Sequence, residues 1–391
     1  MLDVDAILLP YYDRLVADAG ELALFDAHTH VGANDPDGFR QTPAQLLESL
    51  GRADARAVVF PMHEPGGYRA ANDAVLEAAA ASGGRVVAYC RVDPRDDAPA
   101  EAMRALDAGA RGIKLHPRAE QFGLSEPAVR ELVALAHERR VPVLIHAGRG
   151  IPALGQHTVA LSGEFPDAKL ILAHAAISDL AWLWRVLPEH PNLFVDTAWW
   201  NPADLIALFT LAPPAQILWA SDSPYGQPVM SAVVALRCAR QSGLGPAALR
   251  SIAGEQMERL LAGEPGADAG PPPRDVRALN PLLERVVSHL VTAMGRAFAR
   301  TDPDEAVALA RLACAVGDDA QDAPVFAAVL ELLDHYAAHR DVPPPDDRPF
   351  PPAGRFIVTA LAVARTPDVP LPERPQAPPP IRAEAERASG A

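Results

Sequence analysis

Short apolar runs alternate with longer segments of helical spacing between residues 24 and 262. In the longer segments, such as residues 127–140, apolar positions recur every three or four residues, as on one face of a helix. Strands that alternate with helices in this way indicate βαβ units and a parallel sheet, and eight such units favour a closed (β/α)8 barrel over an open sheet. The eight apolar runs span residues 24–31, 55–62, 85–92, 112–117, 141–148, 169–176, 192–198 and 216–224.

The pattern changes after residue 262. Glycine, proline and acidic residues dominate residues 263–279, which predicts a linker at the end of the barrel (residues 1–262). A helical appendage is predicted over residues 280–341, where three stretches again place apolar residues three or four apart. Proline then dominates residues 342–391, so a largely disordered or extended tail is expected, in which only the apolar residues 356–364 are suited to dock on the body.

Composition and charge narrow the function classes. The 391-residue chain is 49% hydrophobic and has a net charge of -15, and the absence of a dense basic run argues against a nucleic-acid partner. Three widely spaced cysteines, an odd number, support neither a disulfide framework nor a thiolate metal cluster. The N-terminal residues lack the basic charge of a secretory signal, and no apolar run is long enough for a bilayer. We expect a cytoplasmic enzyme that acts on a small-molecule substrate. A homo-oligomer is compatible with the sequence.

The histidines carry the chemical signal. Barrel active sites lie at the carboxyl ends of the strands, where this sequence places metal-compatible side chains. In a strand, positions two apart face the same way, so the two histidines of DAHTH can share one cation. Each residue alone has a simpler explanation, as a packed core histidine or a helix cap, but their coincidence at several strand ends of one polarity favours a divalent metal, zinc above all. The residues concerned are His28, His30, His116, His146, His174 and Asp222.

The motifs FDAHTH, GIKLHP, VLIHAG, LILAHAA and WASDSP, in this order over residues 24–262, resemble the amidohydrolase superfamily. The resemblance is to the amidohydrolase-related group, which contains hydrolases and aminocarboxymuconate-semialdehyde-decarboxylase-like enzymes. It implies that one metal is held by His28, His30, His146 and Asp222. It also implies that His174 lies near the substrate, as a second-site ligand or as a handler of protons and charge.

The fourth run leaves one question open, because GIKLHP offers both Lys114 and His116 on one face of a regular strand. In binuclear members of the superfamily a carboxylated lysine or a glutamate at this strand bridges two metals. A carboxylated Lys114 would therefore imply a second ion. The similar KLHP of the amidohydrolase-related group favours one metal, with Lys114 as a cation for the substrate; the simpler alternative is a solvated lysine on the barrel rim.

The leading functional hypothesis is hydrolysis of a C–N or C–O bond at a carbonyl carbon, as in an amide, a cyclic amide or a lactone, by metal-activated water. Asp222 would accept the proton, and His174, Lys114 or His116 would stabilise the oxyanion. Non-oxidative decarboxylation of a small aromatic or unsaturated acid is the alternative, and an inactive barrel that serves as a binding scaffold is the third. Residues of the strand-end loops that could contact substrate, or equally pack or form surface ion pairs, are Arg149, Trp199, Tyr225, His63 and Arg91.

Overall fold

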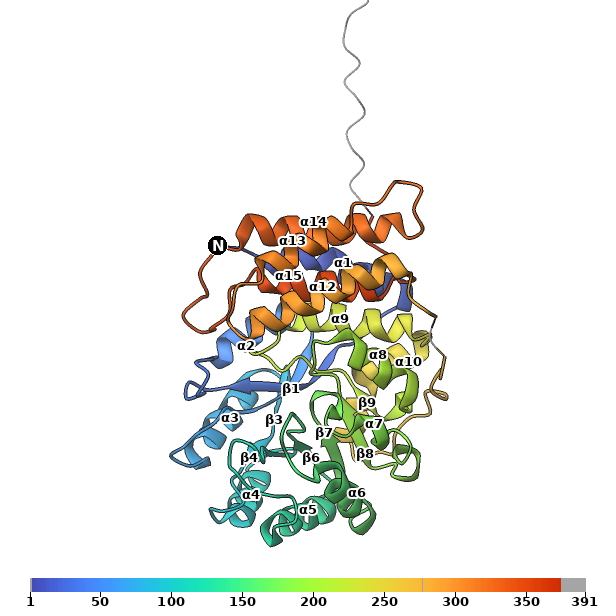
Figure 1. The fold of residues 1–391 in the computed structure, drawn as a ribbon. Coiled ribbons are helices and arrows are strands. Elements are labelled where there is room, and N and C mark those ends of the chain that lie inside the picture. Colours follow the sequence, from blue (N-terminus) through green and yellow to red (C-terminus); the bar gives the residue numbers. More distant parts are fainter. Residues whose placement is uncertain (1, 276, 374–391) are drawn as a thin grey trace, which may run out of the picture.

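The computed structural model describes residues 2–275 and 277–373, and its centre is a ring of short parallel strands (Figure 1). All eight predicted runs contain a strand, and the third is divided into two by Tyr89. The prediction of a mixed α/β barrel is therefore confirmed. The strands are β1 (Phe25–Val31), β2 (Arg56–Pro61), β3 (Val86–Ala88), β4 (Cys90–Arg91), β5 (Ile113–Leu115), β6 (Pro142–Ile145), β7 (Lys169–Leu172), β8 (Leu193–Asp196) and β9 (Ile217–Leu218).

Backbone hydrogen bonds close the ring at two places. The strands form the parallel sheets β1-β2-β3 and β4 to β9, and Tyr89 joins them because its N–H donates to the carbonyl of Val59 (2.9 Å). At the other junction the N–H of Ala27 donates to Trp219 (3.0 Å), and past the end of β9 the N–H of Asp222 donates to His28 (2.9 Å). The first and last strands are thereby held side by side at their carboxyl ends.

Helices surround the ring, and many begin at a proline. Proline, which lacks an N–H and has a fixed φ, suits the first helical turn, where that N–H has no partner. It occupies the first position of α2, α5, α8, α9, α10 and α12. The helices of the barrel region are α1 (Val4–Ala19), α2 (Pro43–Arg52), α3 (Arg69–Ala81), α4 (Ala98–Asp107), α5 (Pro127–Arg139), α6 (Leu154–Glu164), α7 (Leu180–Leu183), α8 (Pro202–Leu211), α9 (Pro228–Gln241), α10 (Pro246–Arg250) and α11 (Gln256–Leu261).

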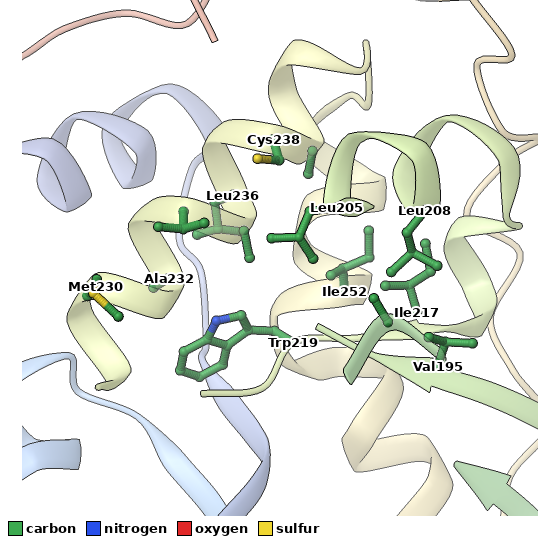
Figure 2. Close-up of a cluster of buried hydrophobic side chains, with 14 of the residues drawn as sticks. Val195, Leu205, Leu208, Ile217, Trp219, Met230, Ala232, Leu236, Cys238 and Ile252 are labelled. Carbon is green, nitrogen blue, oxygen red and sulfur yellow. The ribbon is translucent and has the colours of Figure 1, made fainter. Parts of the chain in front are cut away.

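Two apolar layers follow from strand alternation. Side chains such as Leu218 and Ala220 belong to a cluster inside the ring, whereas Trp219 between them belongs to the layer that joins strands to helices. Figure 2 shows the Trp219 indole lying beside Met230, Ala232 and Leu236 of α9. The residue after the last strand is thus fully buried, which fixes the chain just before it reaches Asp222.

The predicted appendage is helical, as expected: α12 (Pro281–Phe298), α13 (Asp304–Ala313) and α14 (Ala323–His339). The described residues between α11 and α12 contain neither helix nor strand, in agreement with the predicted linker. Within the tail, the apolar residues 356–364, expected to be suited to dock on the body, form most of a further helix, α15 (Gly354–Arg365), which packs on α9. Nine of its side chains are buried, which outweighs the prolines on either side. Residues 374–391 lie outside the described part of the chain.

The C-terminal helices share their hydrophobic cluster with the barrel. In Figure 1, α12 to α15 lie at one end of the molecule together with the N-terminal α1, and both α1 and α15 pack on α9. The appendage is therefore built onto the barrel through a continuous apolar layer, and its definition as a separate domain stays a prediction. Among the described residues, none of the helices has the combination of length and apolar character needed to span a bilayer.

Arg237 of α9 anchors the last helix. Its side chain is fully buried, and burial lowers its pKa to about 10. The guanidinium donates to Thr366 Oγ1 (2.9 Å) and to the carbonyls of Thr366 (3.0 Å), Pro370 (3.0 Å) and Val369 (3.3 Å). The carbonyls at the end of α15 therefore have a charged donor in place of water.

We predict that Arg237→Ala lowers the free energy of unfolding by about 3 kcal/mol or more, because it leaves several buried carbonyls without a donor and opens a cavity. Urea unfolding followed by circular dichroism measures the change. Arg240→Ala, on the same helix but half-buried, is the matched control and should change the free energy by less than about 1 kcal/mol. Equal effects of the two substitutions would contradict the assignment of Arg237 as an anchor.

Candidate metal centre

Three buried ligand atoms converge at the carboxyl ends of the first and last strands. His28 Nε2 lies 3.1 Å from His30 Nε2, and Asp222 Oδ1 lies 3.2 Å from the first and 3.1 Å from the second. Ligands that bind zinc at about 2.0–2.2 Å are separated from one another by roughly 3.0–3.5 Å, so these spacings suit one shared ion. The structure therefore brings together three of the four residues predicted to bind the metal.

Both histidines face Asp222 because β1 is irregular. Phe25 and Ala27 lie in the cluster inside the ring, and strict alternation would turn His28 away from it. The register of β1 against β2 shifts between Asp26 and Thr29, however, and beyond this shift His28 and His30 both face the interior. A β-bulge of this kind redirects side chains and is frequent beside active sites.

A second carboxylate, Asp196 at the end of β8, orients the site. Its Oδ2 lies 2.8 Å from His28 Nδ1, and its Oδ1 accepts the backbone N–H groups of His174 (2.8 Å) and Ala198 (3.0 Å). Because His28 donates through Nδ1, its Nε2 keeps the lone pair that a metal requires. Sequence reasoning missed Asp196, although a carboxylate that ends the apolar run LFVD is the same kind of signal as Asp222.

The backbone is strained at two site residues. His174 has φ 58° and Asp222 has φ 60°, in the left-handed region that few residues other than glycine adopt. Each such residue costs on the order of 1 kcal/mol or more and persists only where the surroundings impose it. Here the hydrogen bonds to Asp196 and to the carbonyl of His28 impose it.

His146, the fourth predicted ligand, lies outside this group. Its Nδ1 is 2.9 Å from His174 Nε2, its ring stacks on His116 with centroids 3.8 Å apart, and its Nε2 points at Gly148. His174 donates through Nδ1 to the carbonyl of Ala198 (2.8 Å), so its Nε2 accepts from His146. His146 Nε2 is then an unprotonated, buried atom that has no hydrogen-bond partner among the described residues. The side chain has the protonation of a ligand, but its ring is turned toward His174 and not toward the ion position.

A cavity of about 370 Å³ opens above the three ligands. Of the predicted substrate contacts, His63, Arg91 and Tyr225 line it. Most of the residues that line the cavity are polar or charged, and they include three residues that sequence reasoning missed. These are Asp35, Asp37 and Arg118.

Two predicted substrate contacts are not brought to the cavity. Arg149 is exposed and lies outside the cavity lining, because the chain turns away at Gly150, where φ is 83°. Trp199 also lies outside it, since its indole N–H donates to Asp204 (2.7 Å). The position of a side chain in a loop depends on these turns, which the strand pattern does not reveal.

A family model described as amidohydrolase matches residues 25–262, more than half of the 391-residue chain. This chain belongs to the amidohydrolase family. Its superfamily consists of metal-dependent enzymes, and the resemblance seen in the sequence motifs is thereby confirmed.

Solved structures with a similar fold are also found for this amidohydrolase-family chain. An uncharacterised TIM-barrel protein from Bordetella bronchiseptica is similar at 18% identity, with a TM-score of 0.50, over 62% of this chain and 99% of its own. This likeness shows the TIM-barrel fold.

Two enzymes are also similar, each over 62% of this chain. The 5-carboxyvanillate decarboxylase LigW from Sphingomonas paucimobilis is 16% identical, with a TM-score of 0.48 over 99% of its length. A probable 2-pyrone-4,6-dicarboxylic acid hydrolase from Acinetobacter baumannii is 15% identical, with a TM-score of 0.46 over its whole length. A search of curated proteins finds no match to the sequence.

The electrostatics of the amidohydrolase-family site fit a cation. Burial lowers the pKa of His28 and of His30 well below the usual value, so both imidazoles are neutral and available as ligands. Burial also raises the pKa of Asp222 well above that of an ordinary carboxyl group. A divalent ion beside Asp222 would reverse this shift, because it supplies the positive charge that the buried carboxylate lacks.

Lys114 is the buried cation nearest to the ligand group. Its Nζ lies 3.2 Å from His28 Nε2 and 4.8 Å from the ring centroid of Phe60. Burial, and then the charge of Arg91, lower its pKa to about 7. Lys114 thus lies beside the ligand group, and the solvated-rim alternative is wrong because the side chain is fully buried.

We predict that Asp196→Asn weakens metal binding about 10- to 100-fold, because His28 loses the carboxylate that fixes its orientation and its tautomer. Competition with a chromogenic zinc chelator measures the affinity. Asp204→Asn, at the carboxylate that holds Trp199, is the matched control and should leave the affinity unchanged. Unchanged zinc affinity in Asp196→Asn would remove this residue from the site.

Proposed function

We propose that this chain is a metal-dependent hydrolase that cleaves a C–N or C–O bond at a carbonyl carbon, in an amide, a cyclic amide or a lactone. The observation that carries the proposal is the position of Asp222. Its Oδ1 faces His28 and His30, while its Oδ2 lies on the side of His174, 4.0 Å from Nδ1. One oxygen is therefore placed to bind a metal and the other to take a proton.

His28, His30 and Asp222 would hold the cation, most simply zinc, and His146 would join them after a rotation of its side chain. Bound there, a divalent cation supplies Lewis acidity, which brings the pKa of water down toward about 7. Asp222 Oδ2 then accepts the proton of the attacking water and later returns it to the leaving group.

Two side chains near the ligand group can donate to the developing oxyanion, and one of them, His116, lines the cavity. His116 accepts the N–H of Ala119 through Nδ1 (3.1 Å), so its Nε2 carries a proton to donate. Lys114 provides a second donor beside His28. Preorganised donors of this kind stabilise charge most strongly where water is excluded.

The cations of the cavity differ in their availability to substrate. Arg91 is paired with Glu120 (2.6 Å), and both side chains are buried, so its charge is already compensated. Arg118 is exposed and lines the cavity, and no ion pair of its side chain is found within the described residues. Arg118 is therefore the better candidate for a substrate carboxylate.

Decarboxylation of a small carboxylic acid is the second candidate, since the same three ligands and Arg118 would also hold a carboxylate. The lining of the cavity favours hydrolysis. A planar substrate would suit an aromatic pocket, for which the loops after β8 and β9 offer Trp199, Trp200 and Tyr225, but neither tryptophan lines this cavity. Tyr225 alone remains, with its ring edge-on to His30 at 5.3 Å between centroids.

We expect the zinc-loaded protein to open lactones or cyclic amides, and Asp222→Asn to lower kcat about 1000-fold, because the proton acceptor is lost. Turnover is measured by titration of the acid released, and zinc content is measured in parallel so that loss of metal is separated from loss of the base. Asp167→Asn, an exposed carboxylate, is the control. Release of CO2 from aromatic carboxylates, without hydrolysis of lactones or cyclic amides, would reverse the order of the two candidates.

We further expect one equivalent of metal per chain, with or without added bicarbonate. The reason is that the described residues offer one group of three converging donors, and Lys114 lies directly against it. Elemental analysis of the protein grown with zinc measures the ratio. Two equivalents that fall to one in Lys114→Ala would indicate a carboxylated, bridging lysine. Less than a tenth of an equivalent would favour a non-catalytic scaffold.

A further inference from the structure

A second cavity, of about 470 Å³, lies between the barrel and the C-terminal helices. We call it the junction cavity. Its walls are largely apolar, and they come from the barrel, from α12 and from the segment that leads into α15. The side chains that define it are Trp200, Tyr225, Met230, Phe298, Phe350 and Val358.

One side chain separates this cavity from the metal centre. Tyr225 lines both cavities: its ring stands edge-on to His30 on one side and packs on Phe39 on the other, with centroids 4.5 Å apart. Its hydroxyl donates to Asp35, which also lines the site cavity. The two cavities therefore adjoin at the Tyr225 ring, and a substrate that extends past this ring from the metal centre would reach the junction cavity.

The C-terminal part of the chain completes this arrangement. Phe298 lies 5.3 Å from Trp200 and 6.1 Å from Phe350, between ring centroids, so barrel and appendage share one aromatic wall. Phe298 is 43% exposed, so part of this aromatic wall faces solvent. Arg300 donates to the carbonyl of Asp37 (3.2 Å), and this bond ties the appendage to the rim of the site cavity.

Two arginines of the junction cavity form ion pairs within the protein. Arg340 pairs with Asp304 (2.7 Å), Arg355 pairs with Asp5 (2.7 Å), and a third arginine, Arg300, lies over the ring of Phe350. The exposed wall is mostly apolar, so the cavity offers mainly apolar contact. An engineered cavity of about 150 Å³ holds a benzene molecule, so this one has room for an aryl ring or a medium-length alkyl chain.

We propose that the junction cavity is a subsite for the apolar part of the substrate, whose polar, hydrolysable group lies at His28, His30 and Asp222. The substrate class is then an amide or lactone that carries an alkyl or aryl substituent, and not a small, wholly polar molecule. This inference rests on the proposed function for the reaction. The C-terminal helices accordingly have a role in substrate selection.

The test uses the binding of straight-chain carboxylates to the zinc-loaded protein, measured by calorimetry. Acetate, hexanoate and decanoate place a carboxylate at the metal and alkyl chains of increasing length toward the junction cavity. We expect Kd to fall up to about fourfold for each methylene that becomes buried. An affinity that does not change with chain length would overturn the proposal.

Two variants locate the effect. Ala297→Phe fills the cavity from α12, and Thr301→Trp fills it from its exposed rim, so each should abolish the dependence on chain length while acetate still binds. Ala299→Phe, an exposed neighbour that does not line the cavity, is the matched control and should behave as wild type. Dependence on chain length that survives both filling variants would place the alkyl chain elsewhere and overturn the proposal.

Two further measurements separate this inference from its alternatives. Removal of residues 374–391 should leave the decanoate affinity unchanged, and a large gain would mean that the chain's own C-terminus occupies the cavity.

Turnover of γ-butyrolactone, γ-octalactone and γ-dodecalactone distinguishes the two proposals. Carboxylate binding that depends on chain length, without turnover of any lactone or cyclic amide, contradicts the hydrolase and keeps the subsite. Turnover together with binding that is independent of chain length contradicts the subsite alone.

Discussion

The hydrogen bonds between the first and last strands are the constraint on which the site depends. His30 and Asp222 are 192 positions apart in the sequence, and they meet because the N–H of Asp222 donates to His28 and the N–H of His30 donates to Ser223 (2.8 Å). The same bonds close the barrel. Closure of the fold and assembly of the ligand group are therefore one event, and a chain that failed to close would have no site.

Burial determines the chemistry once the ring has closed. Six titratable side chains of the site region are buried, where an isolated charge is unfavourable. They are His28, His30, His174, Asp26, Asp196 and Asp222. Burial therefore keeps the imidazoles of His28 and His30 neutral and raises the pKa of Asp222. A divalent cation bound among these side chains would balance the charge of the ionised carboxylate. Asp196 orients His28 through a hydrogen bond. The left-handed backbone at His174 and Asp222 is unfavourable, so orienting these side chains lowers the stability of the fold.

The C-terminal helices share a continuous apolar layer with the barrel. They pack through α9 onto the outer layer, are fixed by buried Arg237, and bring aromatic side chains next to Tyr225. Barrel enzymes vary their substrates mostly through the loops at the carboxyl ends of the strands. Here residues that follow the barrel in the sequence also lie near that end, since Arg300 donates to the carbonyl of Asp37 at the rim of the site cavity.

The sequence by itself determined the barrel, since apolar runs and helical spacing are local properties of the chain, and it identified His28, His30 and Asp222 because each ends or follows such a run. It also marked the helices α12, α13 and α14. It marked residues 356–364 as suited to dock on the body, but it did not predict that they form a helix, α15, which is buried on α9. Only the tertiary structure decided that His146 turns toward His174, that Asp196 supports His28, and that Arg149 and Trp199 stand outside the cavity. The reason is physical. Strand alternation determines on which face of the sheet a side chain lies, whereas the residues that this side chain contacts depend on loop turns and on segments that are distant in sequence.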